Sequence, residues 1–246
     1  MDKLPLTPQV RYMERSVCVA SNAEWYCAIF RAHGIEFERN SNWWMSRERA
    51  PTFHSNFINL TDESSGTFIP WIIELQATLD RPWVIKDAYA SLDLQPFGFE
   101  ILFEANWVWR EAAMAHPPST AAWTKIQSVE ELQKWEKAWR KSQLLEEAEQ
   151  FPASLLSDRS ITIFGRPTEH GYSAGCITNT SPNSIGLSNF FSTTSDIMKN
   201  YTEAVTMVQS GTPDLPLVGF ERGALLACAE TLGFQNAGKL RVWHNP

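Results

Sequence analysis

Cysteine is scarce in this chain of 246 residues, and its few copies are scattered at Cys18, Cys27, Cys176 and Cys228. No two of them form a Cys-x-x-Cys pair, so the sequence predicts neither a disulfide framework nor a zinc site. Long apolar runs are missing as well, and Asp2 and Pro5 interrupt the apolar segment that a signal peptide needs. We therefore expect a protein of the reducing cytoplasm that has no membrane partner.

Basic residues are outnumbered, with 21 Lys and Arg against 28 Asp and Glu and a formal net charge of -7. Binding to nucleic acid is not expected, because neutralising phosphates requires clustered cations and the chain has no long basic run. The sequence also has no HExxH pattern, no Walker loop and no GxGxxG fingerprint. Metalloprotease, NTPase and dinucleotide-dependent activities therefore have no support, and no metal site is predicted.

The chain does contain enough apolar material for a large core. Hydrophobic residues make up 43% of it, and eleven of its residues are Trp. A chain of this length can form one large domain or two small ones without disulfides or metal. The Trp side chains are expected in the core with their indole N–H groups bonded, and an aromatic cage around a ligand is the alternative.

The spacing of apolar residues predicts an α/β chain. Helical spacing predicts helices over residues 16–33, 67–80, 91–97, from 128 onward, 144–156, 194–209 and 224–232. Alternation and short apolar runs predict strands over residues 35–39, 53–60, 83–86, 99–110, 123–127, 161–165, 174–178, 184–191, 215–221 and 239–244. Ser128 and Glu131 have the spacing of a capping box, and residues 1–15 are expected to form an irregular arm.

Three short motifs recur in the second half of the chain. Ser55-Asn56-Phe57 returns as Ser188-Asn189-Phe190, Gly98-Phe99 as Gly233-Phe234, and Val108-Trp109 as Val242-Trp243, at offsets of 133, 135 and 134 residues. Near-constant offsets indicate one supersecondary unit used twice, and coincidence among common residues is the alternative. The proline-containing stretch His116–Thr120 lies near the middle, so we place a boundary near residues 115–122.

The second half resembles a GNAT-type N-acetyltransferase. The resemblance rests on Ser184-Ile185-Gly186-Leu187-Ser188-Asn189-Phe190, on Leu217-Val218-Gly219-Phe220-Glu221, and on Gly233-Phe234 after a helix. It covers about the last third of the chain, with a weaker similarity over residues 53–110. It implies an α/β fold of mixed, mainly antiparallel sheets flanked by helices, with two GNAT-like units in tandem: a degenerate unit over 1–118 and an acyl-CoA-binding unit over 119–246.

The same resemblance implies acetyl-CoA or another acyl-CoA as cosubstrate. Its pantetheine arm would pair with the edge of one strand and lie between that strand and Leu217–Glu221. The residues of the paired strand are Leu187, Ser188, Asn189, Phe190 and Phe191. Its phosphates would lie at the start of the next helix, held by Thr193, Thr194 and Ser195. The family's phosphate loop is rich in glycine and carries Arg or Gln, whereas residues 192–196 have no glycine and no basic residue.

Glu221 is the candidate general base, because a carboxylate at the end of this strand can take a proton from an amine. The alternatives for Glu221 are a helix cap or an ion pair with Arg222. Ala229 stands where the family has the Tyr that protonates the leaving thiolate. The neighbouring Cys228 is either a proton donor in its place or a buried, inert thiol. We therefore expect acyl transfer to an amine of a small molecule or peptide. A non-catalytic binding module with a degenerate CoA site is the alternative.

Overall fold

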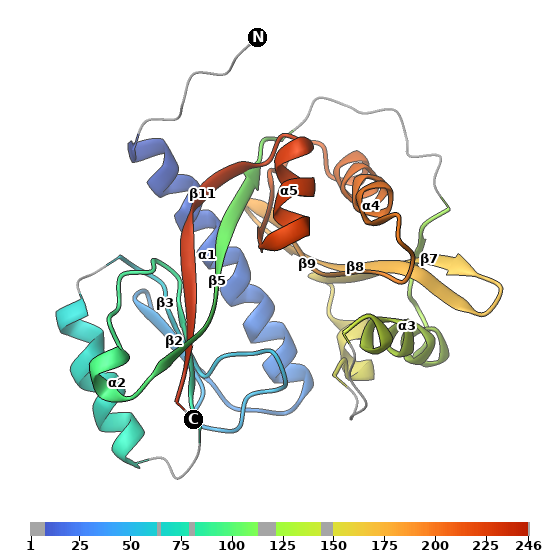
Figure 1. Cartoon of the computed structure of the whole chain (residues 1–246). Helices are drawn as coiled ribbons and strands as arrows, with labels where there is room; N and C mark the ends of the chain where they lie inside the picture. Colours follow the sequence, from blue (N-terminus) through green and yellow to red (C-terminus); the bar gives the residue numbers. More distant parts are fainter. Residues whose placement is uncertain (1–7, 63–64, 79–81, 113–121, 144–149, 246) are drawn as a thin grey trace.

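The computed structural model describes residues 8–62, 65–78, 82–112, 122–143 and 150–245, which form one eleven-stranded sheet with helices on both faces (Figure 1). The helices are α1 (Pro8–Ala32), α2 (Ser65–Thr78), α3 (Val129–Ser142), α4 (Ile197–Gly211) and α5 (Gly223–Thr231), with short 3-10 helices η1 (Gln95–Phe97) and η2 (Ala153–Ser157). The strands are β1 (Glu38–Arg39), β2 (Trp43–Met45), β3 (Phe57–Asn59), β4 (Val84–Asp87), β5 (Glu100–Arg110), β6 (Thr124–Lys125), β7 (Ile161–Thr168), β8 (Gly171–Ser181), β9 (Ser184–Ser192), β10 (Leu217–Glu221) and β11 (Gln235–His244).

The expected class, a mixed and mainly antiparallel sheet flanked by helices, is confirmed. The strand order is β1-β2-β3-β4-β11-β5-β10-β9-β8-β7-β6, and in the described part only β3 with β4 and β9 with β10 run parallel. On β10, Val218 belongs to the apolar cluster around α1 and α3, whereas neighbouring Leu217 belongs to the cluster around α4 and α5. Because consecutive strand residues point to opposite faces, these two groups of helices cover opposite faces of the sheet.

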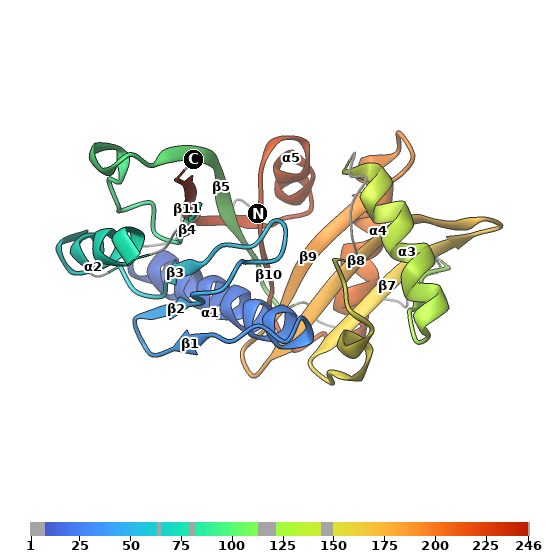
Figure 2. The same ribbon diagram turned by 90° about the horizontal axis from the view of Figure 1, so that it is seen from below.

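The centre of the sheet is shared between the two halves of the chain (Figure 2). Strand β11, the last of the chain, lies between β4 and β5, and β5 lies between β11 and β10. Each half of the chain therefore contributes strands that pair with strands of the other half. Residues 115–121 of the boundary expected at 115–122 lie outside the described residues, and the division into 1–118 and 119–246 stays a prediction.

The two halves show the same order of elements. Strand, helix, strand, a second helix and strand follow one another from β3 to β5 and again from β9 to β11, with η1 in the place of α5. Gly98 and Gly233 take left-handed φ values of 84° and 83°. In both places the next amide, of Phe99 or Phe234, donates to a carbonyl five residues earlier. A glycine is favoured at each position because that φ disfavours a side chain.

The sheet register tests the other two motif matches. Val108 and Trp109 pair with Gly219 and Val218, and Val242 and Trp243 pair with Lys86 and Ile85 in the same way. The faces differ, however: Ile85 belongs to the apolar cluster with α2, whereas Val218 faces α1 and Leu217 belongs to the cluster with α4, so Leu217 corresponds to Ile85 and the Val-Trp match does not occupy equivalent positions. The partners of Ile85 and Leu217 on the next strand are Phe57 and Ile185, so the Ser-Asn-Phe match does not occupy equivalent positions either. The reason is that β9 continues well beyond its pairing with β10.

Three local expectations need correction. Residues 8–15 belong to α1 rather than to an irregular arm. The strand β2 was not predicted, because three residues are too few to show alternation. Of the helix expected over 144–156, residues 144–149 lie outside the described residues, and residues 153–157 form the 3-10 helix η2 after Pro152.

The capping box of α3 is confirmed. The hydroxyl of Ser128 accepts from the Glu131 amide at 3.2 Å, and the Glu131 carboxylate accepts from the amides of Gln127 and Ser128 at 2.8 and 3.1 Å. These two amide bonds lower the pKa of Glu131. The cap fixes the start of a helix whose Trp135 donates from its indole to the Phe164 carbonyl at 2.8 Å.

Replacing this cap has a predictable cost. Ser128→Ala is expected to lower the free energy of unfolding by about 1 kcal/mol, because one amide of the first turn of α3 loses its acceptor. Urea denaturation measures the change. Ser128→Thr keeps the acceptor and serves as the control, and equal stability of the two variants would contradict the assignment.

Candidate functional site

The strands β9 and β10 separate soon after they meet. They pair only at Ile185 with Leu217 and at Gly186 with Val218, although β9 continues to Ser192 and β10 to Glu221. Gly219 lies where they part: a Cβ atom built on it would stand 2.7 Å from the Leu187 carbonyl oxygen. The absence of a side chain at Gly219 therefore keeps this gap in the sheet open.

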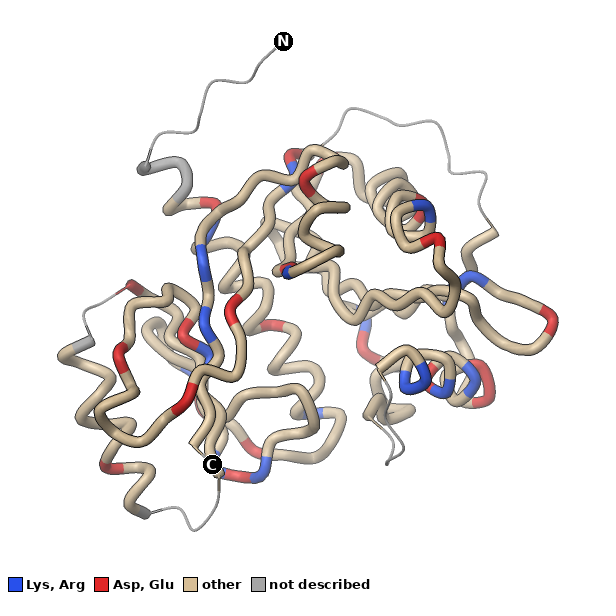
Figure 3. The backbone as a smooth tube through the Cα atoms, in the orientation of Figure 1, with Lys and Arg blue, Asp and Glu red and all other residues tan. Residues whose placement is uncertain are grey.

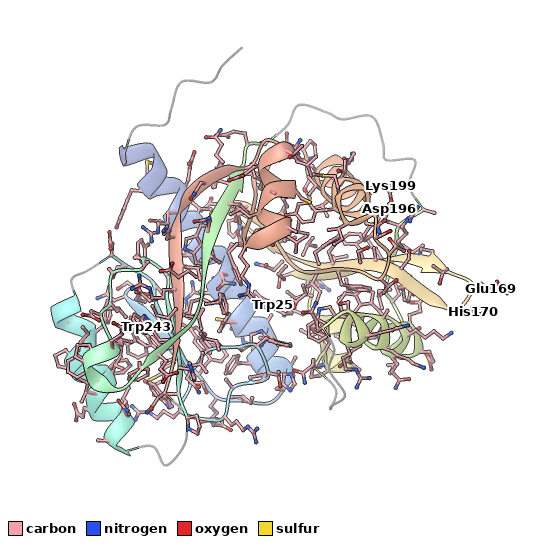
Figure 4. The ribbon with its side chains drawn as sticks, viewed as in Figure 1. Trp25, Glu169, His170, Asp196, Lys199 and Trp243 are labelled. Carbon is pink, nitrogen blue, oxygen red and sulfur yellow. The ribbon has the colours of Figure 1, made fainter. Side chains whose placement is uncertain are left out.

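A cavity of about 250 Å³ opens at this gap. Its walls come from α1, the end of α3, α5, the segment before β3 and the four strands β5, β8, β9 and β10. Most of the large lining side chains are aromatic: Trp25, Phe53, Trp107, Trp139, Phe190 and Phe220. In Figure 4, Trp25 lies between the half of the molecule that contains α2 and the half that contains α3. The cavity is thus built by both halves of the chain.

The wall formed by β9 is uncharged. Neither β8 nor β9 contains Lys, Arg, Asp or Glu, and both are tan throughout in Figure 3. Four of the five predicted pantetheine residues line the cavity: Leu187, Ser188, Asn189 and Phe190. The fifth, Phe191, packs edge-on against Trp135 at 5.2 Å instead.

A bulge in β9 explains this difference. Ser188 pairs with Ile177 and Phe191 with Gly175, so β9 has one more residue than β8 between these pairs, and Asn189 takes a φ of +52°. The side chain of Phe191 therefore points to the face of the sheet that α3 covers.

Glu221 is the acidic residue of the cavity wall. Its carboxylate accepts a hydrogen bond from the Tyr201 hydroxyl at 3.1 Å. Burial raises the pKa of Glu221 to about 7, while the bond from Tyr201 acts in the opposite direction. A carboxyl with this pKa exchanges a proton near neutral pH, as a general base must.

The structural alternatives for Glu221 are not seen in the described part of the chain. No ion pair joins it to Arg222, whose guanidinium lies over the Phe103 ring at 4.6 Å. The first turn of α5 has no side-chain cap. The charge of Glu221 is thus balanced by no cation among these residues, which leaves it available to an amine.

Tyr201 is a partner of Glu221 that sequence reasoning missed. It is fully buried on α4, and its ring meets Phe190 edge-on at 4.9 Å. Burial, followed by the nearby Glu221, raises the pKa of Tyr201 well above its ordinary value, so the phenol stays protonated. The sequence signal was only the helical spacing of Tyr201, Ala204, Val205 and Val208, which is also the signal of an ordinary core face.

The predicted phosphate residues Thr193, Thr194 and Ser195 are exposed and do not line the cavity. Two of their amides already bond within the protein: Thr193 donates to the Ser173 carbonyl at 2.8 Å, and Thr194 to the Ser192 hydroxyl at 3.3 Å. The helix α4 begins directly after this loop without a side-chain cap. Asp196 and Lys199 lie close together at that end in Figure 4.

Cys228 is the remaining candidate from the sequence. Cys228 is buried, and desolvation followed by the charge of Glu221 raises the pKa of its thiol, which therefore stays protonated. Glu169 and His170 are exposed at the tip of the β7–β8 hairpin (Figure 4). Lys86 and Asp87 form no pair, since Asp87 accepts from the amides of Ser91 and Leu92. All four cysteines are free, and the described residues hold no group of three metal-ligating side chains.

One further motif is explained by the fold. Gly171-Tyr172-Ser173-Ala174-Gly175 matches the Gly-x-Ser-x-Gly pattern of serine hydrolases, whose nucleophile sits on a sharp strand-to-helix turn. Here the motif lies along β8, paired with β7 on one side and β9 on the other. Ser173 donates to the Arg166 carbonyl at 3.4 Å. The pattern is therefore part of a hairpin rather than a nucleophile site.

Comparison with known proteins was informative at the level of structure only. No protein-family model and no curated protein matches the sequence. A conserved protein of unknown function from Staphylococcus epidermidis has a similar structure, with 10% identity, a TM-score of 0.60, and coverage of 88% of this chain and 96% of that one. A GCN5-related N-acetyltransferase from Kribbella flavida matches with 9% identity, a TM-score of 0.58, and coverage of 94% and 95%.

A two-unit protein is also similar. The N-myristoyltransferase of Saccharomyces cerevisiae, solved with bound myristoyl-CoA, matches with 8% identity and a TM-score of 0.52. The match covers 74% of this chain but only 56% of that one. The chain therefore has a GNAT-type fold, arranged as two GNAT-like units in tandem, as the sequence predicted. In the described part of the chain, no helix has the length and apolar character needed to cross a membrane.

Proposed function

We propose that the chain is an acyl-CoA-dependent N-acyltransferase with one active site, at the gap between β9 and β10. The observation that carries this proposal is the half-buried Glu221, whose carboxyl has a raised pKa, on the wall of a cavity that opens where two parallel strands part. The GNAT-type fold supports acyl transfer as the reaction class, although fold alone does not fix function. The proposed donor is acetyl-CoA or another acyl-CoA, and the acceptor is an amine.

In this proposal each wall of the gap has a defined role. The unpaired edges of β9 and β10 beyond Gly186 and Val218 hold the extended arm of the donor, as a sheet edge holds a peptide. Glu221 takes the proton that the amine loses as its nitrogen bonds to the thioester carbon. The C–S bond breaks, and the departing sulfur takes a proton from solvent. Tyr201 orients Glu221 through their hydrogen bond. Strand amides near the bulge at Asn189 stabilise the developing oxyanion.

The first unit lacks this apparatus, which supports a single site. By pairing and by face, Ile85 corresponds to Leu217, so Asp87 occupies the position of Gly219 and Tyr89 that of Glu221. Asp87 accepts from the amides of Ser91 and Leu92, and the Tyr89 hydroxyl donates to the Leu60 carbonyl at 3.2 Å. The first unit thus has a side chain where the second has Gly219, and it has no carboxyl in the place of Glu221. We infer that the two units arose from an internal repeat in which only the second kept a reaction site. We also infer a reducing compartment such as the cytoplasm, because all four cysteines are free thiols.

A non-catalytic binding module is the second candidate, and the loop before α4 favours it. Two amides of that loop are already bonded, and Asp196 places a negative charge where phosphates would lie. Isothermal titration calorimetry with acetyl-CoA and with desulfo-CoA tests both candidates. Binding in the micromolar range, followed by acetylation of an amine, supports the enzyme. No binding at millimolar ligand would overturn the proposed function.

Charge reversal at the start of α4 tests the phosphate position. Asp196→Lys is expected to tighten acetyl-CoA binding about three- to tenfold, because a cation replaces an anion beside the pyrophosphate. Calorimetry at low salt measures the change. Asp214→Lys, in the loop after α4, carries the same change of charge and serves as the control. An equal effect of both variants would show that only the net charge matters.

A further inference from the structure

Lys86 is a buried cation beside the cavity. Its side chain is only 3% exposed at the end of β4. The ammonium donates to the Asn22 side-chain carbonyl at 3.0 Å and lies 4.7 Å from the centre of the Tyr26 ring and 4.5 Å from that of the Phe220 ring. In the part of the chain that the structure describes, no carboxylate lies within ion-pair distance of it.

The surroundings of Lys86 are neutral on every side. The helix α1 contributes Asn22 and Tyr26, and β10 contributes Phe220. His54 is close enough for the charge of Lys86 to act on it: its pKa is lowered to about 3, mainly by burial and also by that charge. His54 is therefore uncharged. Ring faces and an amide offset part of the desolvation of an ammonium, but the strongest partner for a buried cation is an anion.

The cavity lies directly beyond two of the three residues that touch this ammonium. Asn22 and Phe220 are both cavity-lining residues, and Lys86 contacts the two of them. Phe220 precedes Glu221 on β10, and consecutive strand residues point to opposite faces. The cavity thus has an acidic group on one face of the sheet and, behind a thin wall, a basic group on the other. This separation of charge matches a zwitterion.

We propose that the acceptor is an amine that also carries a carboxylate and an aromatic side chain, as an aromatic amino acid does. Its amine faces Glu221, and its carboxylate accepts from the Asn22 side-chain amide, whose carbonyl the Lys86 ammonium holds from behind the wall. Its ring lies among Trp25, Trp107 and Trp139 on the cavity wall. This assignment rests on the proposed function for the transfer step, but the binding of the carboxylate does not require that step.

Binding of three matched compounds tests the proposal. L-phenylalanine has both charges, phenethylamine lacks the carboxylate and 3-phenylpropionate lacks the amine. By calorimetry, the protein is expected to bind phenylalanine about ten- to a hundredfold more tightly than phenethylamine, because a charged hydrogen bond is lost with the carboxylate. Equal affinity for these two compounds, or no binding of phenylalanine at millimolar concentration, overturns the proposal.

Lys86→Met tests the residue itself. It keeps most of the side-chain volume and is expected to erase the preference for phenylalanine while leaving phenethylamine binding unchanged. Lys239→Met, on the exposed part of β11, is the charge-matched control and should keep the preference. Circular dichroism establishes that Lys86→Met is folded. If Lys86→Met is not folded, Asn22→Leu is the test variant instead, and it should also lose the preference for phenylalanine. A preference that survives in the folded variant would mean that Lys86 only packs α1 against the sheet, and would overturn the proposal.

The outcomes separate this proposal from the proposed function. A protein that binds phenylalanine with the expected preference but does not bind acetyl-CoA supports the zwitterion site and contradicts acyl transfer. A protein that acetylates phenethylamine as readily as phenylalanine supports acyl transfer and contradicts the zwitterion site.

Discussion

Glu221→Gln is expected to lower kcat for acyl transfer by about a hundredfold or more, with little change in the affinity for acyl-CoA. General base catalysis contributes roughly 10²–10⁴ in rate, and the amide of Gln cannot take the proton of the attacking amine. The size and shape of the side chain are kept, and the amide oxygen can still accept from Tyr201. Steady-state kinetics, together with calorimetry for acyl-CoA, measures the two effects separately.

The pH dependence provides a second readout of the same variant. Because burial raises the pKa of Glu221 to about 7, the base form is present mainly above pH 7. The kcat/KM of the wild type should therefore rise with pH up to about 7 and then level off. This limb should be missing in Glu221→Gln. A wild-type profile that is flat between pH 5.5 and 8 would exclude Glu221 as the base.

Stability should change in the opposite direction from activity. The folded pKa of Glu221 lies above the unfolded value of 4.5, so the folded state holds the proton more tightly. Below pH 4.5 both states are protonated and the group contributes nothing. Between pH 4.5 and 7 the unfolded state loses its proton first, and the wild type loses stability as pH rises. The side chain of Gln does not titrate, so Glu221→Gln does not lose stability in this pH range. Its free energy of unfolding at pH 8 should exceed that of the wild type by roughly 1–3 kcal/mol. This result does not depend on what the protein catalyses.

Local sequence patterns predicted the elements well where they are regular. The alternation over 161–165, 174–178 and 184–191 gave three strands of the described hairpins. The capping box at Ser128 placed the start of α3, and the Gly98 and Gly233 matches fell on two positions with the same left-handed backbone. These features depend on neighbours within a few residues, so the sequence alone contains the physical signal.

The arrangement at the centre of the sheet has no such local signal. Strand β11 pairs with β4 and β5, more than a hundred residues away, and nothing in the pattern of Gln235–His244 selects those partners. The contact between Tyr201 and Glu221 was missed for the same reason, since α4 and β10 approach only in the folded chain. Lys86 is the last residue of the strand expected over 83–86, but its place behind the cavity wall follows from α1 and β10 together.

The site was predicted best where it coincides with backbone geometry. Resemblance pointed to β9 and β10 as the walls of the gap, and Leu187, Ser188, Asn189, Phe190 and Glu221 do lie on one cavity. It gave no account of the bulge at Asn189, which turns Phe191 toward Trp135. The role of each of these residues in binding stays a prediction, and the gap itself can be tested directly.

Gly219→Val is expected to close the gap and to weaken acyl-CoA binding by about ten- to a hundredfold. A Cβ atom at this position would lie 2.7 Å from the Leu187 carbonyl oxygen, which belongs to the backbone of the opposite wall and cannot turn aside. Either β9 or β10 must shift, and the added methyl groups occupy the space that the donor's extended arm requires. Overpacking of this kind costs about 1–3 kcal/mol, which corresponds to that range of affinity.

The position of the glycine, rather than the loss of a glycine as such, causes the effect. Gly211, at the end of α4, would meet no atom within 4 Å of an added Cβ, so Gly211→Val is the matched control and should bind acyl-CoA as the wild type does. Gly219→Ala should show a smaller loss than Gly219→Val, because the clash begins at the Cβ and grows with the side chain. Calorimetry with acetyl-CoA ranks the three variants, and circular dichroism shows that each is folded. Wild-type affinity in folded Gly219→Val would place the donor outside the gap between β9 and β10 and so remove the main support for the proposed reaction site.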